Sequence, residues 1–296
     1  MTSRLRAELV LLGVTVAWGG SFLVAKDALA TIAPFTLVAS RFALATLALG
    51  CVFGRGAFAL GTGAAGRVRW RRAVWIGVLL WAAFALQTTG LAFTTPARSG
   101  FITATYVAMV PLLARVLLGR ALRKRVLFAV LAALVGLYLL TDPRGSGANA
   151  GDALTLLSAL AFAAHMVALE RWARESPAVP LAFAQMAVVA GLSLPCALAF
   201  ESAPMLPDLR SLGSIAYLGL ICSAAAFLGQ TWGQRHTSAT RVGLIFSLES
   251  LFAALLSVGM GAETLSALQW LGGLLLLGGV VVGELPDPPA EGAPSD

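Results

Sequence analysis

The chain has 296 residues, of which 58% are hydrophobic and only 12% are charged, and its mean hydropathy is +0.85. This is more apolar surface than the core of one water-soluble domain can bury, so the composition excludes a soluble globular protein and predicts an integral membrane protein. The net charge of +7 would suggest nucleic acid as the partner of a soluble domain. Here the basic residues lie between apolar runs, so the expected partner is the lipid bilayer and no nucleic acid is expected.

Ten apolar runs follow one another along the chain, and most approach the length of about 20 residues that crosses a bilayer as a helix. The first five are residues 8–25, 34–53, 73–93, 97–118 and 126–140, and the second five are 152–169, 180–200, 212–232, 239–260 and 265–283. The turn-forming stretch TDPRGSGANAG, at 141–151, separates the two sets. The sequence therefore predicts an all-α membrane protein of ten transmembrane helices, with one half in residues 1–146, a second half in 147–284 and a disordered cytoplasmic tail in 285–296.

One stretch of the chain occurs twice. AFALQTTGLAFTTPARSG, at 83–100, returns as AFLGQTWGQRHTSATRVG at 226–243, and eight of the 18 aligned positions are identical at an offset of 143. Two copies of a unit that crosses the membrane an odd number of times enter it in opposite directions. We therefore predict that the two halves are inverted five-helix repeats.

The basic residues predict the orientation of the chain in the membrane. If the N-terminus is cytoplasmic, the segments on that side hold 15 of the 21 Lys and Arg residues and the segments on the opposite side hold four, while Arg41 and Arg115 lie within spans. Cytoplasmic loops carry the excess of positive charge. The sequence thus predicts a multi-pass protein of the inner (plasma) membrane with both termini in the cytoplasm.

Polar side chains inside membrane spans are rare and often mark binding sites or pathways. In six of the predicted spans, a polar side chain shares a helix face with aromatic or apolar ones at spacings of three or four residues. Such a lining suits a small molecule that combines an apolar body with hydrogen-bonding groups. The residues predicted to bind this substrate are Trp18, Ser21, Phe22, Phe84, Gln87, Thr88, Tyr106, Met109, Phe162, His165, Phe227, Gln230, Thr231, Glu249 and Phe252.

Each of these residues also has a purely structural explanation. Gln and Thr in membrane helices often bond a neighbouring helix or their own backbone, and an aromatic residue such as Trp18 or Phe84 is ordinary packing when taken alone. A single hydrogen bond to another helix would satisfy His165, and without a second ligand beside it no metal site is expected. No cofactor is expected either. The recurrence of Gln87 as Gln230 favours the cavity.

Four charged residues need an explanation of their own. Glu249 lies within a span, where an ionised carboxylate is costly, so it is a candidate proton carrier or partner of a substrate ammonium group, and structural pairing with a basic residue is the alternative. Arg41 is expected to extend to the membrane surface or to pair with Asp27. Arg98 and Arg241 each begin a helix, where the helix dipole opposes a cation. They are predicted to form two gates on opposite sides of the membrane, or else to anchor turns at the interface.

Two long segments resemble a known family. WGGSFLVAKDALATIAPFTLVASRFALATLAL, at 18–49, and SLESLFAALLSVGMGAETLSALQWLGGLLLLGGVVV, at 247–282, are similar to the EamA family of the drug/metabolite transporter superfamily. In the second segment Glu263 precedes the last helix, which we expect it to cap. The resemblance covers essentially the whole chain and implies a ten-helix inverted-repeat carrier, commonly an exporter of amino acids or other metabolites. Two positions depart from the family pattern, because Ser250 stands where proline is frequent and Arg120 stands where an acidic residue is frequent.

The sequence as a whole predicts an exporter of small amphipathic metabolites that works by alternating access, and its expected cargo is amino acids, including aromatic and bulky apolar ones. Proton antiport through Glu249 and facilitated flux without a titrating group both stay open. A carrier of sugar phosphates or nucleotide sugars is a weaker alternative, because an anionic substrate needs several basic residues at mid-membrane. A channel is the alternative from another class. An enzyme is not expected, because no paired carboxylates or metal-binding constellation lie within the spans.

Overall fold

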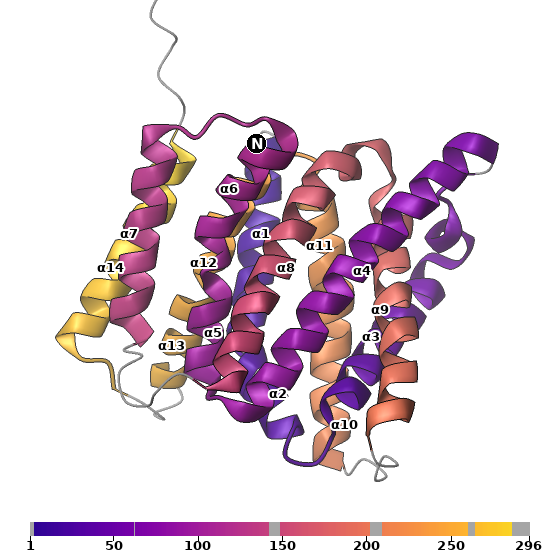
Figure 1. Cartoon of the computed structure of the whole chain (residues 1–296), viewed down its shortest axis with the longest axis horizontal. Helices are drawn as coiled ribbons and strands as arrows, with labels where there is room; N and C mark the ends of the chain where they lie inside the picture. Colours follow the sequence, from indigo (N-terminus) through magenta and orange to yellow (C-terminus); the bar gives the residue numbers. More distant parts are fainter. Residues whose placement is uncertain (1–2, 62, 142–148, 202–208, 260–263, 286–296) are drawn as a thin grey trace, which may run out of the picture.

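The computed structural model in Figure 1 describes residues 3–61, 63–141, 149–201, 209–259 and 264–285. Every regular element within these ranges is a helix, so the predicted all-α fold is confirmed. The predicted boundary between the halves at 146/147, the predicted cap Glu263 and the predicted tail beyond Leu285 lie outside the described residues.

The first half of the bundle contains α1 (Ser3–Gly19), α2 (Ser21–Ala28), α3 (Pro34–Phe53), η1 (Gly54–Phe58), α4 (Gly63–Phe93), α5 (Pro96–Ala104), α6 (Tyr106–Leu118) and α7 (Lys124–Thr141). The second half contains α8 (Ala150–Trp172), η2 (Ala173–Glu175), α9 (Ala178–Phe200), α10 (Leu209–Ala216), the π-helix η3 (Tyr217–Ala225), α11 (Ala226–Gly233), α12 (Ala239–Ser247), α13 (Glu249–Gly259) and α14 (Ala267–Glu284). Several predicted spans are therefore made of two or three consecutive helical pieces.

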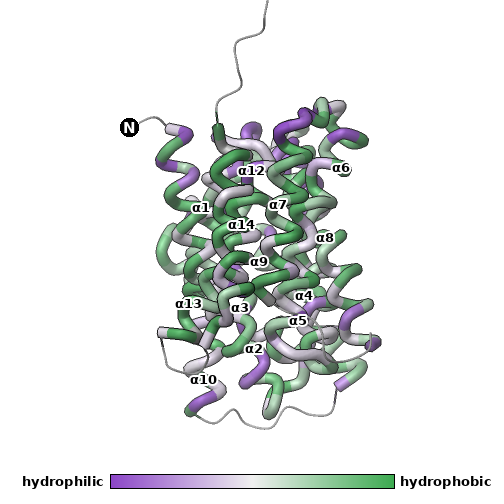
Figure 2. The backbone as a smooth tube through the Cα atoms, turned by 90° about the vertical axis from the view of Figure 1, so that its left-hand side faces the viewer, coloured by the Kyte–Doolittle hydropathy of each residue, from purple (hydrophilic) through white to green (hydrophobic). Residues whose placement is uncertain are grey.

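Eight helical segments in the described part of the chain are long and apolar enough to cross a membrane, and 267–283 forms a shorter apolar helix. Large apolar side chains cover the outside of the bundle, such as Leu198 and Val116, which are 75% and 79% exposed. Hydrophobic residues predominate along the length of the bundle in Figure 2. These features confirm a membrane-spanning protein, whereas the count of ten helices stays a prediction.

The two halves break their helices at equivalent positions. The predicted span 97–118 is interrupted at Thr105, and the span 239–260 is interrupted at Leu248, 143 residues later. The helices that lead into these breaks begin with equivalent caps as well. Thr95 and Ser238 each accept a hydrogen bond from the backbone N–H three residues later, at 3.3 and 3.5 Å.

α7 and α14 pack side by side (Figure 1), and glycines lie at their contact. A Cβ on Gly136 would lie 2.5 Å from the backbone nitrogen of Leu276, and a Cβ on Gly279 would lie 3.0 Å from that of Ala133. Gly136 and Gly279 are 143 residues apart, and so are Ala133 and Leu276. Each member of the pair thus uses the same patch to meet the other, which is the signature of a twofold axis between inverted repeats.

Both ends of the bundle can be told apart by the course of the chain. α1 begins and α14 ends on the same side, at the top of Figure 1, and we call this the terminus side and the opposite one the far side. α4 also extends on the terminus side, where it begins at Gly63, ten residues before the predicted start of its span. These ten residues include four arginines, which placed them outside the predicted apolar run. Arginine does not interrupt the backbone hydrogen bonds of a helix, so α4 includes them.

Candidate functional site

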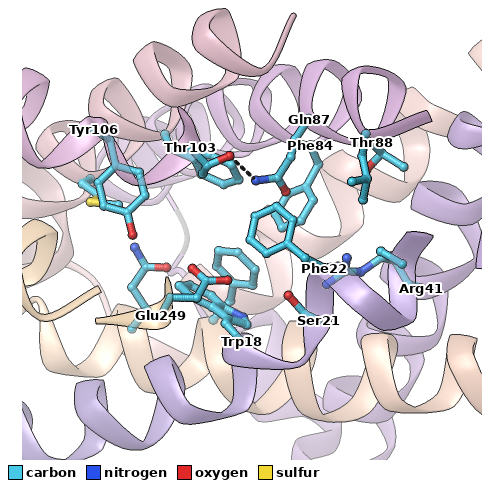
Figure 3. A pocket seen from close by; sticks show the side chains of 16 residues that line it. Trp18, Ser21, Phe22, Arg41, Phe84, Gln87, Thr88, Thr103, Tyr106 and Glu249 are labelled. Carbon is cyan, nitrogen blue, oxygen red and sulfur yellow. Dashed lines mark hydrogen bonds between the residues drawn. The ribbon is translucent and has the colours of Figure 1, made fainter. Parts of the chain in front are cut away.

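A central cavity lies between the two halves. Its lining comes from both repeats, and its volume is about 50 Å³ in this conformation. Eleven of the fifteen predicted substrate-binding residues line it: Trp18, Ser21, Phe22, Phe84, Gln87, Thr88, Tyr106, Phe162, Phe227, Gln230 and Glu249. Five further lining residues were not among the fifteen: Met166, which shares a helix face with Phe162, and Ala25, Arg41, Leu91 and Thr103. Figure 3 shows how the labelled side chains converge.

Aromatic rings form one continuous wall of the central cavity. The ring of Phe227 lies 5.3 Å from that of Trp18 and 5.7 Å from that of Phe84, and Phe84 lies 5.2 Å from Phe162, all in tilted or edge-to-face geometry. The indole of Trp18 is held in place because its Nε1–H donates to the carbonyl oxygen of Cys222, at 2.8 Å. The wall thus presents fixed ring faces and edges to an apolar group.

Two buried polar atoms of the cavity lack a hydrogen-bond partner among the described residues. They are the Oε1 atom of Gln230 and the hydroxyl of Tyr106. The Nε2 atom of Gln230 already donates to Gln234 at 2.9 Å, whereas Gln87 Nε2 donates to Thr103 Oγ1 at 3.1 Å (Figure 3). Buried polar atoms are nearly always bonded, so the two orphan atoms provide an acceptor and a donor for a guest molecule or water.

The cavity also contains one cation and one carboxyl group. Glu249 is the first residue of α13 and is 9% exposed, and its side chain makes no hydrogen bond or salt bridge within the described ranges. Arg41 is 5% exposed, and its Nε–H donates to the hydroxyl of Ser223 at 3.0 Å. The prediction that Arg41 extends to the surface or pairs with Asp27 is therefore wrong, since Asp27 pairs with Arg210 at 2.6 Å instead.

Four predicted residues lie outside the lining of the central cavity. His165 Nε2 contacts the amide oxygen of Gln185 at 2.8 Å, and the amide nitrogen of Gln185 donates to Thr231 at 3.2 Å. This buried network joins α8, α9 and α11, so both residues point toward α9 and not toward the cavity. Met109 and Phe252 pack partly buried against the hydrophobic core. The sequence predicted which residues share a helix face, but it did not predict that Gln185 of α9 bonds His165 and Thr231.

A vestibule on the far side lies next to the central cavity. Its volume is about 530 Å³, and two residues, Phe22 and Glu249, line both spaces. Most of the remaining lining of this far-side vestibule comes from the start of α5, from α13 and from the start of α14, among them Thr95, Ser250 and Gln269, and Leu140 of α7 also lines it. Glu249 therefore borders the deep cavity and its open approach at once.

A second vestibule, of about 400 Å³, lies on the terminus side and shares no lining residue with the central cavity. The repeat relates the two vestibules. Ser238 and Gly283 line the terminus-side vestibule, and Thr95 and Leu140, which are 143 residues earlier in the chain, line the far-side vestibule. Val107, the repeat equivalent of Ser250, is fully buried. In the described structure, the far-side vestibule shares two lining residues with the central cavity, whereas the terminus-side vestibule shares none.

The two predicted gating arginines lie on opposite sides of the bundle. Arg98 forms an ion pair with Asp152 on the far side, and Thr94 donates to the same carboxylate at 2.9 Å. Arg241 lines the terminus-side vestibule. The ion pair joins α5 to α8, so Arg98 connects one repeat to the other.

A carboxylate on the terminus side makes a matching connection. Glu170 accepts a hydrogen bond from the backbone N–H of Ala239, at the start of α12, and pairs with Arg120, each at 2.8 Å. Arg120 was noted above as a departure from the family pattern, and its partner is now identified. No sequence signal predicted this contact, because the two residues are 50 positions apart.

Comparisons with known proteins agree with this architecture. The model of the EamA-like transporter family matches residues 5–142 and 149–283, one match for each half. An uncharacterized transporter of Archaeoglobus fulgidus is 33% identical over 281 residues, which cover 94% of this chain and 86% of that protein. A solved crystal structure is similar with a TM-score of 0.79 and 21% identity, covering 95% of this chain and 97% of that one. At this identity the last likeness establishes the fold alone.

Proposed function

Because the chain belongs to the EamA-like transporter family, and is thus a multi-pass membrane transporter, we propose that it exports small amphipathic metabolites. The resemblance found in the sequence is thereby confirmed, and membership of the drug/metabolite transporter superfamily follows from it. The expected cargo is amino acids with aromatic or bulky apolar side chains. The family name indicates transport and not an enzymatic reaction.

The central cavity carries this proposal. It combines an aromatic wall with a small number of polar groups, of which Gln230 Oε1 and the Tyr106 hydroxyl have no partner in the described structure. An apolar side chain would lie against the rings of Phe84 and Phe227, while the polar end of the same molecule would take up the orphan atoms. A purely apolar cargo would leave those atoms unsatisfied.

Alternating access is the proposed mechanism. The two vestibules are repeat-related, and in this conformation only the far-side one shares lining residues with the central cavity, namely Phe22 and Glu249. If the two halves exchange their conformations, the terminus-side vestibule would open and be bordered by the equivalent residues, which are Met166 for Phe22, at an offset of 144 in this pair of helices, and Tyr106 for Glu249, at 143. The distribution of basic residues supports a cytoplasmic terminus side, so the described state would be open to the outside.

Proton coupling is the part of the mechanism that depends on Glu249. A carboxyl that borders both the cavity and its open vestibule could take up a proton from the outside and release it after the conformational exchange. A facilitator that runs down the cargo gradient would need no such group. Flux with and without a pH gradient distinguishes the two.

The alternatives have less support. Of the two arginines within predicted spans, Arg41 lines the cavity and Arg115 is exposed on the surface of the bundle, so a phosphate dianion would meet a single cation there. A channel predicts flux that neither saturates nor shows exchange between labelled and unlabelled cargo. Counterflow in vesicles would exclude it.

The experiment is a panel of radiolabelled amino acids assayed in proteoliposomes. We expect aromatic or branched amino acids to move, and we expect Gln87→Leu and Gln230→Leu to reduce their flux about two- to tenfold, the worth of one neutral hydrogen bond. Leu274→Ala, at a side chain that is 65% exposed on the outer face of α14, is the control and keeps its flux. Flux of no amino acid in the panel, or equal losses in all three variants, would contradict the proposal.

A further inference from the structure

Arg41 is a buried cation that lacks a counter-ion. Within the described ranges it makes no salt bridge, and its one side-chain hydrogen bond runs from Nε–H to the Ser223 hydroxyl, at 3.0 Å. That hydroxyl in turn donates to the carbonyl oxygen of Leu218 at 2.8 Å, in the π-helix η3. A charge taken out of water without a partner is costly, so its presence beside a cavity points to a negative group on the guest.

The surroundings of Arg41 leave the two terminal nitrogens of its guanidinium group available for a hydrogen-bond acceptor. The guanidinium carbon lies 4.8 Å from the centre of the Phe84 ring and 5.3 Å from that of Phe42, so the rings cover the group from the side. The two terminal nitrogens have no acceptor among the described residues, and Arg41 lines the central cavity. Figure 3 shows the side chain reaching from α3 toward Ser21 and Phe22.

Glu249 lines the same cavity, but its carboxyl group does not pair with Arg41 in the described structure. No salt bridge joins Glu249 to Arg41 within the described structure, and Figure 3 draws them at opposite ends of the lining, with Phe22 and Ser21 between them. The cavity is therefore dipolar, with a guanidinium group at one end and a carboxyl group at the other. A guest with one negative and one positive group would complement both.

We propose that Arg41 is the binding site for the carboxylate of the cargo and that Glu249 receives its ammonium group, so that the transporter selects zwitterionic α-amino acids. This inference rests on the proposed function and narrows its substrate class. The planar guanidinium group of arginine matches the two oxygens of a carboxylate, and its packing against Phe84 limits the orientations that it can take. A dianionic phosphate would leave one negative charge unmatched and would face the Glu249 carboxyl.

The cargo also needs room. The central cavity holds about 50 Å³ here, which is space for a few water molecules and not for an amino acid. Phe22 separates it from the far-side vestibule of about 530 Å³, and both spaces are lined by this ring. Binding therefore requires the Phe22 side chain to move, which would join the two spaces.

The test measures binding to the full-length protein in lipid nanodiscs with three ligands of one shape. Phenylalanine carries both charges, phenethylamine lacks the carboxylate and 3-phenylpropionate lacks the amine. For the unchanged protein we expect phenylalanine to bind about tenfold or more tightly than either analogue, the usual size of a charged hydrogen bond. Arg41→Gln should remove the preference over phenethylamine and leave phenethylamine binding unchanged, which also shows that the variant is folded. Arg115→Gln removes an exposed arginine of a predicted span and should keep the preference.

The outcomes separate this inference from the proposed function. If the unchanged protein binds phenylalanine and Arg41→Gln retains the full preference over phenethylamine, the assignment of Arg41 is overturned while the transporter of amino acids stands. If the unchanged protein neither binds nor transports any of the three, the proposed cargo is wrong. Should Arg41→Gln not fold, Arg41→Lys takes its place, because lysine keeps the charge without the planar guanidinium group. A several-fold loss of preference then supports the assignment, and an unchanged preference refutes it.

Discussion

A methyl group added at the α7–α14 contact is expected to destabilise the protein. A Cβ on Gly272 would lie 2.5 Å from the backbone nitrogen of Leu140 and 2.7 Å from the carbonyl oxygen of Gly136. Ordinary contact begins near ~3.5 Å, so Gly272→Ala would have to separate the helices by about 1 Å. Overpacking of this kind costs about 1–3 kcal/mol, and the better helix propensity of alanine returns up to about 1 kcal/mol. We expect a net loss of about 1–2 kcal/mol, or a fall in Tm of roughly 2–8 °C.

Gly278→Ala provides the matched control on the same helix. A Cβ at Gly278 would meet nothing within 4 Å, so this variant gains helix propensity without a clash and should keep or slightly raise its Tm. Tryptophan fluorescence of the detergent-solubilised protein during heating measures both. Equal shifts for the two variants would refute the close approach of α7 and α14, and with it the contact that relates the repeats.

Three further outcomes are expected. In a chain without its native cysteines, Ser250→Cys should react with a membrane-impermeant maleimide at least about tenfold faster than Val107→Cys. Ser250 lines the far-side vestibule, whereas Val107, its repeat equivalent, is fully buried. Equal rates would mean that the terminus side is not closed. Glu249→Gln should abolish any flux driven by a pH gradient, and unchanged gradient-driven flux would exclude the proton role. Asp152→Asn should lower the free energy of unfolding by about 1–3 kcal/mol through the largely buried ion pair between α5 and α8, whereas Asp27→Asn, in an exposed pair, should change it by less than about 1 kcal/mol.

Helix boundaries were predictable where local chemistry fixes both ends. The range 34–53 is observed without change as α3, because Pro34 occupies the first turn and Gly54 ends the helix with a φ of 51°. The start of α4 was not predictable from hydropathy, since its first ten residues extend past the apolar run. The break at Gly20 between α1 and α2 falls in the Gly-Gly-Ser step of the segment that resembles the family, and such a step favours a local change of backbone direction.

The candidate site was predictable as far as it depends on one helix at a time. The spacing of Phe84, Gln87 and Thr88 places all three on one face, and that face does line the cavity. What lies opposite a face depends on which helices pack together, and sequence periodicity does not state this. His165 was assigned to the cavity because its partner Gln185 is on another helix, and Arg41 was assigned to the surface for the same reason.

The difference between the two repeats matters for function as much as their likeness. Tyr106 and Glu249 begin equivalent helices and line the same cavity, yet only the second carries a carboxyl group. A perfectly symmetric pair of repeats would respond alike from both sides of the membrane, because the twofold axis would relate each conformation to the other. In the proposed cycle, a proton or an ammonium group meets its partner in the second repeat alone, and it meets that partner from the far side in the state described here. The duplication thus supplies two exchangeable conformations, and the divergence at this one pair of positions would supply the group through which a proton gradient could drive the exchange in one direction.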